Sequence, residues 1–156
     1  MRIQTLYLDT STIGGYFDGN WSDDTRALWQ QRENGLWTFI SSGLVAQEIA
    51  GAPDDVRGLF ESTFDRSTDL LPITQEMESL AEEYLKAGVV SAKFADDALH
   101  VAVCTVHQVD HLVSWNFKHL VSVRRAAGFN AVNLLHGYRP VSIVSPKELI
   151  YDCEDN

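Results

Sequence analysis

The sequence predicts an α/β sandwich with a largely parallel sheet. Along the whole chain, short runs rich in β-branched and aromatic residues alternate with segments of helical character, as in consecutive strand and helix units. The length of 156 residues suits one domain. Because no linker, internal repeat or low-complexity tract interrupts the sequence, we expect a single domain over residues 1–151 and a short acidic tail over 152–156.

The first strand and helix are indicated by an apolar run and a helix-start signal. Residues 3–8 form a short apolar run that stops at Asp9, which predicts a strand. Ser22 followed by two acidic residues is typical of a helix N-cap and first turn, and the Asn-Gly pair at 34–35 is typical of a helix end. Aromatic and β-branched residues return at 36–40, where we expect the second strand.

The middle of the chain predicts two short helices, a strand and a longer helix. The serine pair at 41–42 caps a short helix that carries Glu48, and Pro53 opens the next helix. We expect the third strand at 70–73. Residues 74–86 have apolar side chains at helical spacing, which predicts an amphipathic helix.

The last third contains the most strongly helical stretch of the sequence, residues 94–108. This segment is apolar on more than one side, so we expect a central helix packed between other elements. The remaining predicted elements are a fourth strand at 111–115, a helix at 120–127 that ends at Gly128, a fifth strand at 141–144 and a helical turn that begins at Pro146.

The charge balance bears on the partners of the protein. Twelve Lys and Arg against 22 Asp and Glu give a net charge of −10. This charge argues against nucleic-acid binding by bulk electrostatic attraction. It suits a basic partner, or a site where a cation offsets clustered carboxylates.

Cysteine use and the apolar stretches bear on the compartment. Cys104 lies in an apolar run and is interpreted as a core residue, whereas Cys153 lies in the polar tail. Two such cysteines do not indicate a disulfide framework. The first residues do not resemble a signal peptide, and no run approaches the about 18 apolar residues of a membrane span, so we expect a cytoplasmic protein without membrane contact.

Four polar residues follow predicted strands where parallel sheets bind ligands, beyond the carboxyl ends of the strands. They are Asp9 after the first strand, Glu48 on the helix after the second, Asp97 in the first turns of the central helix, and Asn116 after the fourth strand. Three carboxylates and an amide form an oxygen-rich set, which suits Mg²⁺ or Mn²⁺. Such an ion lowers the pKa of its bound water and stabilises charge on a phosphoryl group.

Each of these residues also has a plainer interpretation. Asp9 and Asn116 are residue types that often cap turns. Glu48 can lie on a solvated helix face, and Asp97 can favour the helix dipole. The metal-site hypothesis therefore depends on the four positions taken together.

Three neighbouring polar residues leave further alternatives open. His100 lies on the same helical face as Asp97, and it contacts a substrate phosphate, hydrogen-bonds the carboxylate or is a half-buried structural histidine. Lys118 and His119 follow Asn116, and they meet a phosphate or lie in a solvated loop. The sequence has no Gly-rich nucleotide-binding loop and no Gly-x-Ser-x-Gly motif, so these two chemistries have no support.

Four segments form an ordered set over nearly the whole chain: Tyr7-Leu8-Asp9-Thr10-Ser11, the Ser41-Ser42 pair leading to Glu48, Asp97-Ala98-Leu99-His100-Val101-Ala102, and Leu112-Val113-Ser114-Trp115-Asn116-Phe117. With these segments the chain resembles the PIN-domain family, and in particular the VapC-type toxins of toxin–antitoxin pairs. The resemblance implies a three-layer α/β/α sandwich with a mostly parallel sheet. It also implies an acidic pocket that holds Mg²⁺ or Mn²⁺.

The resemblance further implies a catalytic set and an activity, the metal-dependent cleavage of RNA phosphodiester bonds by an endoribonuclease. Asp9, Glu48 and Asp97 match the first three acids of the family. The fourth position is frequently Asp in the family, and here it is Asn116, which leaves a neutral oxygen among the implied catalytic and metal-binding residues. This departure bears on whether a second metal binds.

The implied substrate contacts and partners complete this hypothesis. Ser11 matches a small hydroxyl residue often found beside the first acid, and Lys118 or His100 would help to position the phosphate. VapC-type toxins are usually dimers and pair with an antitoxin, so the resemblance implies a homodimer and an antitoxin protein as well as RNA.

Two other interpretations stay open. The first is a catalytically weak PIN-fold protein that binds RNA or a protein partner, which Asn116 and the acidic composition favour. The second is a phosphatase of the haloacid-dehalogenase type, which also places an Asp after its first strand. Those enzymes use Asp-x-Asp, whereas the third residue here is Ser11.

Overall fold

The computed structural model describes residues 2–154, and their side chains as far as residue 150. Its strands and helices follow one another as the sequence predicts, with additional short helices. In chain order they are β1 (Gln4–Leu8), α1 (Thr10–Gly15), α2 (Ser22–Glu33), β2 (Trp37–Ser42), α3 (Gly43–Ile49), α4 (Asp54–Thr63), the 3₁₀ turn η1 (Ser67–Asp69), β3 (Leu70–Leu71), α5 (Gln75–Lys86), the 3₁₀ turn η2 (Ala92–Phe94), α6 (Ala95–His107), β4 (His111–Val113), α7 (Val123–Leu135), β5 (Ile143–Val144) and α8 (Pro146–Glu154).

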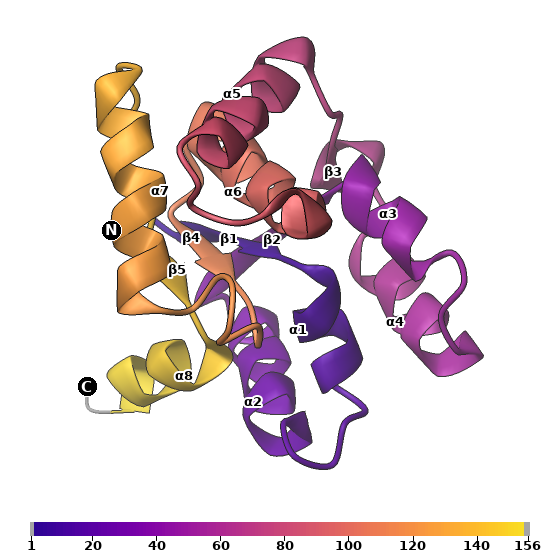
Figure 1. The fold of residues 1–156 in the computed structure, drawn as a ribbon. Coiled ribbons are helices and arrows are strands. Elements are labelled where there is room, and N and C mark those ends of the chain that lie inside the picture. The colour runs from indigo at the N-terminus through magenta and orange to yellow at the C-terminus, as the bar shows by residue number, and fades with distance from the viewer. Residues whose placement is uncertain (1, 155–156) are drawn as a thin grey trace.

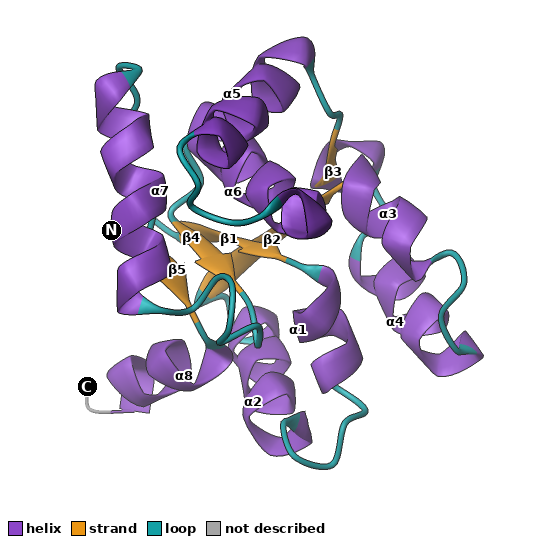
Figure 2. Ribbon diagram, viewed as in Figure 1, coloured by secondary structure: helices purple, strands orange, loops and turns teal. Residues whose placement is uncertain are grey.

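The sheet is parallel throughout, which confirms the sequence-based prediction. Within residues 2–154 it has five strands in the order β3-β2-β1-β4-β5, and each neighbouring pair is parallel (Figure 2). β1 lies at the centre, where Tyr7 is in register with Ile40 of β2 and Leu112 of β4. Leu6, Tyr7 and Leu8 have no exposed surface, as expected of a parallel strand covered on both faces.

Helices cover both faces of the sheet and give the three-layer α/β/α sandwich that the sequence led us to expect. Figure 1 shows α5 and α6 on one face, with α1, α2 and α8 on the other. The central helix α6 is buried on several sides, and its Cys104 is a core residue as predicted. None of the helices among residues 2–154 combines the length and the apolar character that crossing a bilayer requires.

The helix α1 was not predicted, and it arises from the residue that ends β1. Asp9 has an extended backbone and accepts a hydrogen bond from the Thr12 backbone N–H, so it is the N-cap of this short helix. The start of α2 also differs from the prediction. Trp21, not Ser22, is the N-cap residue, and it makes no side-chain capping bond.

The predicted end of the helix near Gly128 is wrong. α7 runs from Val123 to Leu135, so Gly128 lies inside it. A Cβ atom at Gly128 would lie 3.0 Å from the Val89 Cγ1 atom. The glycine therefore permits close packing here and does not terminate the helix. At the C-terminus, α8 extends to Glu154, so it includes part of the predicted acidic tail, and the last two residues lie outside the described residues.

Candidate active site

The four predicted site residues lie at one edge of the sheet, which we call the carboxyl edge because the strands end there. They are Asp9 directly after β1, Glu48 on α3 after β2, Asp97 in the first turn of α6, and Asn116 three residues after β4. Hydrogen bonds link these segments, as described below. The parallel sheet is what brings residues so distant in sequence to a common edge.

Asp9 is buried and held by four hydrogen bonds. Its Oδ1 atom accepts from the Thr12 backbone N–H at 3.0 Å, the Thr12 hydroxyl at 3.0 Å and the Ser11 hydroxyl at 2.8 Å. Its Oδ2 atom accepts from the Ser114 hydroxyl at 2.6 Å. The helix-cap interpretation of Asp9 is therefore correct, and the same bonds fix the carboxylate at the carboxyl edge.

Ser11 and Ser114 join the loop after β4 to the start of α1. The Ser11 hydroxyl accepts a hydrogen bond from the Trp115 backbone N–H at 2.9 Å, and the Ser114 hydroxyl accepts one from the Asn116 backbone N–H at 2.9 Å. Ser11 thus positions this loop against Asp9. Its contact with substrate stays a prediction.

Asn116 lies between Asp97 and its own loop. Its amide nitrogen is 3.4 Å from the Asp97 Oδ1 atom, at the long end of hydrogen-bond distance, and its Oδ1 atom accepts from the His119 backbone N–H at 3.0 Å. The side chain therefore presents a donor to the acid, and its oxygen closes a turn.

Glu48 belongs to a chain of hydrogen bonds that reaches into the core. Its Oε1 atom accepts from the Thr10 hydroxyl at 2.9 Å and lies 2.8 Å from the His100 Nε2 atom. The Nδ1 atom of His100 lies 2.7 Å from the Tyr7 hydroxyl, which is 2.7 Å from the Ser42 hydroxyl. His100 is buried and both ring nitrogens are engaged, so it holds Glu48, not Asp97. Its phosphate contact stays a prediction.

The ionisable groups at the carboxyl edge shift each other's pKa. Burial raises the pKa of Asp97, the charges of Asp9 and Glu48 raise it further, and His100 and His119 oppose the shift. Burial also disfavours the charged form of Glu48, but hydrogen bonds from His100 and Thr10 outweigh it and lower the pKa of Glu48. Burial opposes protonation of His100, yet Glu48, Asp9 and Asp97 together raise the pKa of this histidine. Of Glu48 and Asp97, Asp97 is therefore the acid whose charge is less compensated.

His119 and Lys118 differ in their surroundings. Lys118 is exposed, as expected in a solvated loop, and its phosphate contact stays a prediction. His119 is buried and stacks on Phe94 with ring centroids 3.7 Å apart. Among the described residues its Nδ1 atom is buried without a hydrogen-bond partner. The sequence alone does not indicate this burial, because it comes from the packing of Phe94 against His119.

The residues that organise the site were mostly hidden in the sequence. Thr10, Tyr7 and Ser114 each bind one of the predicted site residues, yet none was a candidate on its own. Thr10 had a visible signal in the Thr-Ser-Thr cluster after Asp9. Tyr7 resembles an ordinary strand residue, and only the fold shows that its hydroxyl meets His100.

The donor set fits a hard cation only in part. Among residues 2–154, no group of three or more His, Cys, Asp or Glu is placed to hold a metal ion. The oxygen ligands thus lie at one edge without forming a closed coordination shell. Mg²⁺ usually keeps several waters and takes only one or two carboxylates, so this open arrangement fits an ion held partly through water.

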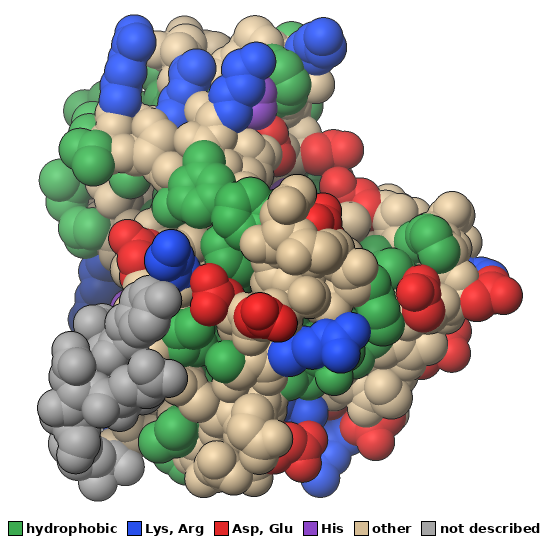
Figure 3. Space-filling view, turned by 90° about the horizontal axis from the view of Figure 1, so that it is seen from below, with side chains coloured by type: hydrophobic (Ala, Val, Ile, Leu, Met, Phe, Trp, Pro, Cys, Tyr) green, Lys and Arg blue, Asp and Glu red, His purple; other side chains and the backbone are tan. Residues whose placement is uncertain are grey.

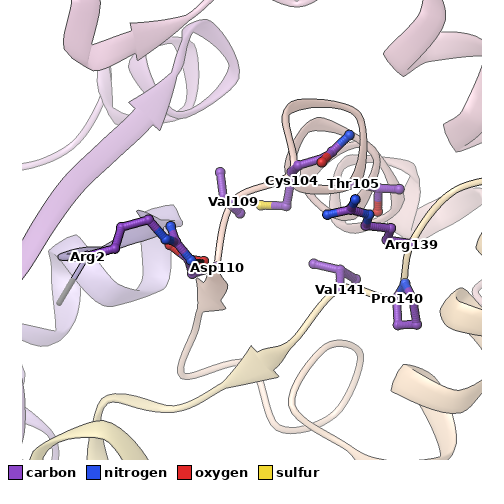
Figure 4. A pocket seen from close by; sticks show the side chains of 9 residues that line it. Arg2, Cys104, Thr105, Val109, Asp110, Arg139, Pro140 and Val141 are labelled. Carbon is purple, nitrogen blue, oxygen red and sulfur yellow. Dashed lines mark hydrogen bonds and ion pairs between the residues drawn. The ribbon is translucent and has the colours of Figure 1, made fainter.

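A cavity of about 500 Å³ lies at the opposite edge of the sheet, where the strands begin (Figure 4). Both Arg2 and Asp110, which precede β1 and β4, line it. The two side chains pair through contacts of 2.7 and 2.9 Å, and Asp110 also accepts from the Thr5 backbone N–H at 2.7 Å. None of the predicted site residues lines this cavity, so it is separate from the candidate active site.

An all-parallel sheet between two helical layers, with acids at its carboxyl edge, is consistent with a PIN-like fold. The structure is similar to the solved structure of FitAcB from Neisseria gonorrhoeae, with 14% identity, a TM-score of 0.53 and coverage of 90% of this chain and 97% of that chain. It is also similar to FitAB bound to an IR36 DNA fragment, with 15% identity, a TM-score of 0.54 and coverage of 90% and 94%. At these identities the likeness shows a shared fold.

Sequence comparison adds nothing further. A scan against protein-family models finds no match, and a search of curated proteins finds no significant one. The resemblance to PIN domains is thus confirmed at the level of the fold.

Proposed function

We propose that this protein is a metal-dependent endoribonuclease that hydrolyses RNA phosphodiester bonds, as the toxin of a type II toxin–antitoxin pair. The observation that carries the proposal is a group of three acids at the carboxyl edge whose charge no Lys or Arg neutralises among the described residues. Burial raises the pKa of Asp97 most, His100 and His119 lower it in part, and the charges of Asp9 and Glu48 add to the rise. Among the described residues, no Lys or Arg forms an ion pair with these three acids, and only His100 pairs with Glu48. A divalent cation held by these acids would offset their charge.

Asp9, Glu48 and Asp97 would hold Mg²⁺ or Mn²⁺, partly through water, with Asn116 adding no charge. When bound, the ion supplies an activated water and stabilises charge on the phosphoryl group. The protein contributes rigid placement. Four hydrogen bonds hold Asp9, and His100 holds Glu48, so both carboxylates are fixed in orientation by their neighbours.

The partners in this proposal follow from charge and from exposed apolar side chains. A net charge of −10 suits a basic antitoxin. Figure 3 shows several lysine and arginine side chains in a row along the upper edge of the face viewed, where RNA phosphates would find local positive charge. On α7, Val123, Leu134 and Leu135 are exposed by 92, 62 and 81%. These residues suit a homodimer contact.

The test compares two neighbouring acids on α6. We expect purified protein to cleave RNA in the presence of Mg²⁺ or Mn²⁺, and we expect cleavage to stop when a chelator is added in excess. Asp97→Asn should abolish cleavage, whereas Asp96→Asn should retain it, because Asp96 is exposed and only Asp97 contacts Asn116. Full cleavage in chelator, or equal activity of the two variants, would overturn the proposal.

A second candidate function is a PIN-fold protein that binds RNA or a protein partner and cleaves poorly. The orientation of Asn116 favours it, since this residue presents an amide N–H to Asp97 where an acid would add a ligand oxygen. Tight RNA binding by wild-type protein, with no cleavage in either Mg²⁺ or Mn²⁺, would select this alternative.

A further inference from the structure

Three aromatic side chains form a stack beside the candidate active site, which we call the aromatic platform. Trp21 and Trp115 are stacked, with ring centroids 4.4 Å apart and an interplanar angle of 21°. Phe117 leans against both, at 5.8 Å from Trp21 and 6.0 Å from Trp115. Trp115 is buried, Trp21 is partly exposed and Phe117 is 45% exposed. The platform therefore exposes the rings of Phe117 and Trp21 to solvent, and the buried ring of Trp115 lies beneath them.

The platform is rigid because its buried member is fixed on several sides. The Trp115 indole N–H donates to the Thr25 hydroxyl at 2.9 Å, and the Trp115 backbone N–H donates to Ser11 at 2.9 Å. A Cβ atom at Gly15 would lie 2.7 Å from the indole, so the glycine makes room for this ring. The Phe117 backbone N–H donates to the Trp115 carbonyl at 3.0 Å, which holds Phe117 in the same turn.

The platform and the candidate active site share one loop. Trp115 and Phe117 are the immediate neighbours of Asn116, whose side chain contacts Asp97. The exposed Lys118 follows directly. The loop that brings Asn116 to Asp97 therefore also carries two of the three rings and a cation.

We propose that the aromatic platform stacks a base of single-stranded RNA on Phe117 and Trp21, next to the phosphate that is cleaved. The inference rests on the proposed function and names its substrate as a single strand. Bases of a duplex are already stacked, whereas splayed bases stack on aromatic side chains. Stacking does not depend on net charge, so it contributes to affinity even in a protein with a net charge of −10. Stacking accepts every base, so the platform fixes strandedness and not sequence.

The test measures affinity apart from cleavage. A fluorescent RNA decamer without secondary structure is titrated in Ca²⁺, and gels verify that it stays intact. Phe117→Ala should bind roughly 5- to 100-fold more weakly than wild type, and Phe117→Tyr should bind like wild type. Phe17→Ala is the matched control, because Phe17 is 38% exposed and, among the described residues, its ring pairs with Tyr16 and with no ring of the platform. A decamer of the same backbone without bases should bind all four proteins equally weakly.

The outcomes separate the platform from the nuclease. Loss of affinity in Phe117→Ala together with no cleavage by wild type in Mg²⁺ or Mn²⁺ keeps the platform and rejects the nuclease. Cleavage by wild type with unchanged affinity in Phe117→Ala keeps the nuclease and overturns the platform, and so does an equal loss in Phe17→Ala. If the rings contact a second protein instead of RNA, Phe117→Ala should bind RNA as wild type does, and that result also overturns the platform.

Discussion

Each edge of the sheet has an acid near an end of β4, Asp110 where the strand begins and Asp97 where it ends. Their surroundings shift the two pKa values in opposite directions. At the edge where strands begin, the hydrogen bonds from Arg2 lower the pKa of Asp110, although burial opposes the shift. At the carboxyl edge, burial and two neighbouring acids raise the pKa of Asp97. The first acid is neutralised by the chain itself, so its role is structural. The second forms no ion pair with a Lys or Arg among the described residues, which supports the cation site that we propose there.

The largest expected effect tests whether catalysis belongs to only one of these edges. Asp97→Asn should lower RNA cleavage in Mg²⁺ by at least about 100-fold, the usual scale for losing one preorganised electrostatic contact. Asp110→Asn should keep cleavage within about twofold, because Asp110 lies at the far edge. The measurement is the initial rate of cleavage of a labelled RNA, with circular dichroism to verify folding. Equal loss in two folded variants would remove the distinction between the edges.

The next effect is the response of stability to metal. At a Mg²⁺ concentration of about 100 times its Kd, binding stabilises the folded state by about 2.7 kcal/mol. For a chain of this size we expect the melting temperature of wild type to rise by about 5–10 °C. Asp110→Asn should show the same rise and Asp97→Asn little of it. Thermal unfolding with and without Mg²⁺ measures this. A rise that survives in Asp97→Asn would place the ion elsewhere.

The sequence predicts much of the fold because its signals are local and repeated. The apolar run before Asp9 and the aromatic run at 36–40 gave strands in nearly their observed places. Gly128 misled the prediction, since a glycine is a frequent helix end and its contact with Val89 comes only from tertiary packing. The unpredicted α1 depends on the side chain of Asp9 as a cap, which competes with its interpretation as a ligand.

The site was predictable in position but not in its internal bonding. Strand ends locate Asp9 and Asn116, because parallel topology brings such ends to one edge. The partner of His100 was not predictable. Helical spacing pairs it with Asp97, whereas the fold brings Glu48 from α3 to within 2.8 Å of its ring. Side-chain pairing between elements distant in sequence depends on packing that no local pattern encodes.

Without metal, replacing the acid at one edge should lower the melting temperature, and replacing the acid at the other edge should raise it. The pKa of Asp110 is lowered by folding, so its stabilising contribution is present above its ordinary value of 3.8 and is lost as pH falls through the folded pKa. The pKa of Asp97 is raised, so its ionisation costs stability as pH rises above 3.8. At pH 7 in chelator, Asp110→Asn should melt lower and Asp97→Asn higher, each by about 2–4 °C for about 1 kcal/mol. Near pH 3 both differences should shrink. Destabilisation by Asp97→Asn at pH 7 would make this acid structural.

The smallest effect concerns Asn116, which makes the carboxyl edge one charge less negative than the PIN pattern. Asn116→Asp replaces the N–H that faces the Asp97 Oδ1 atom at 3.4 Å with a carboxylate oxygen. Repulsion should lower the metal-free melting temperature by about 2–4 °C, for about 1 kcal/mol. The added charge should tighten Mg²⁺ binding, because ligand charge tunes such sites, so the stabilisation by Mg²⁺ should exceed that of wild type.

Asn116→Ala is the control, since it removes the same hydrogen bond and adds no charge. It should weaken cleavage less than Asp9→Asn. Metal titration and thermal unfolding of the three proteins decide the matter: if Asn116→Asp and Asn116→Ala respond alike to Mg²⁺, charge at this position does not reach the ion, and the fourth ligand has been placed wrongly.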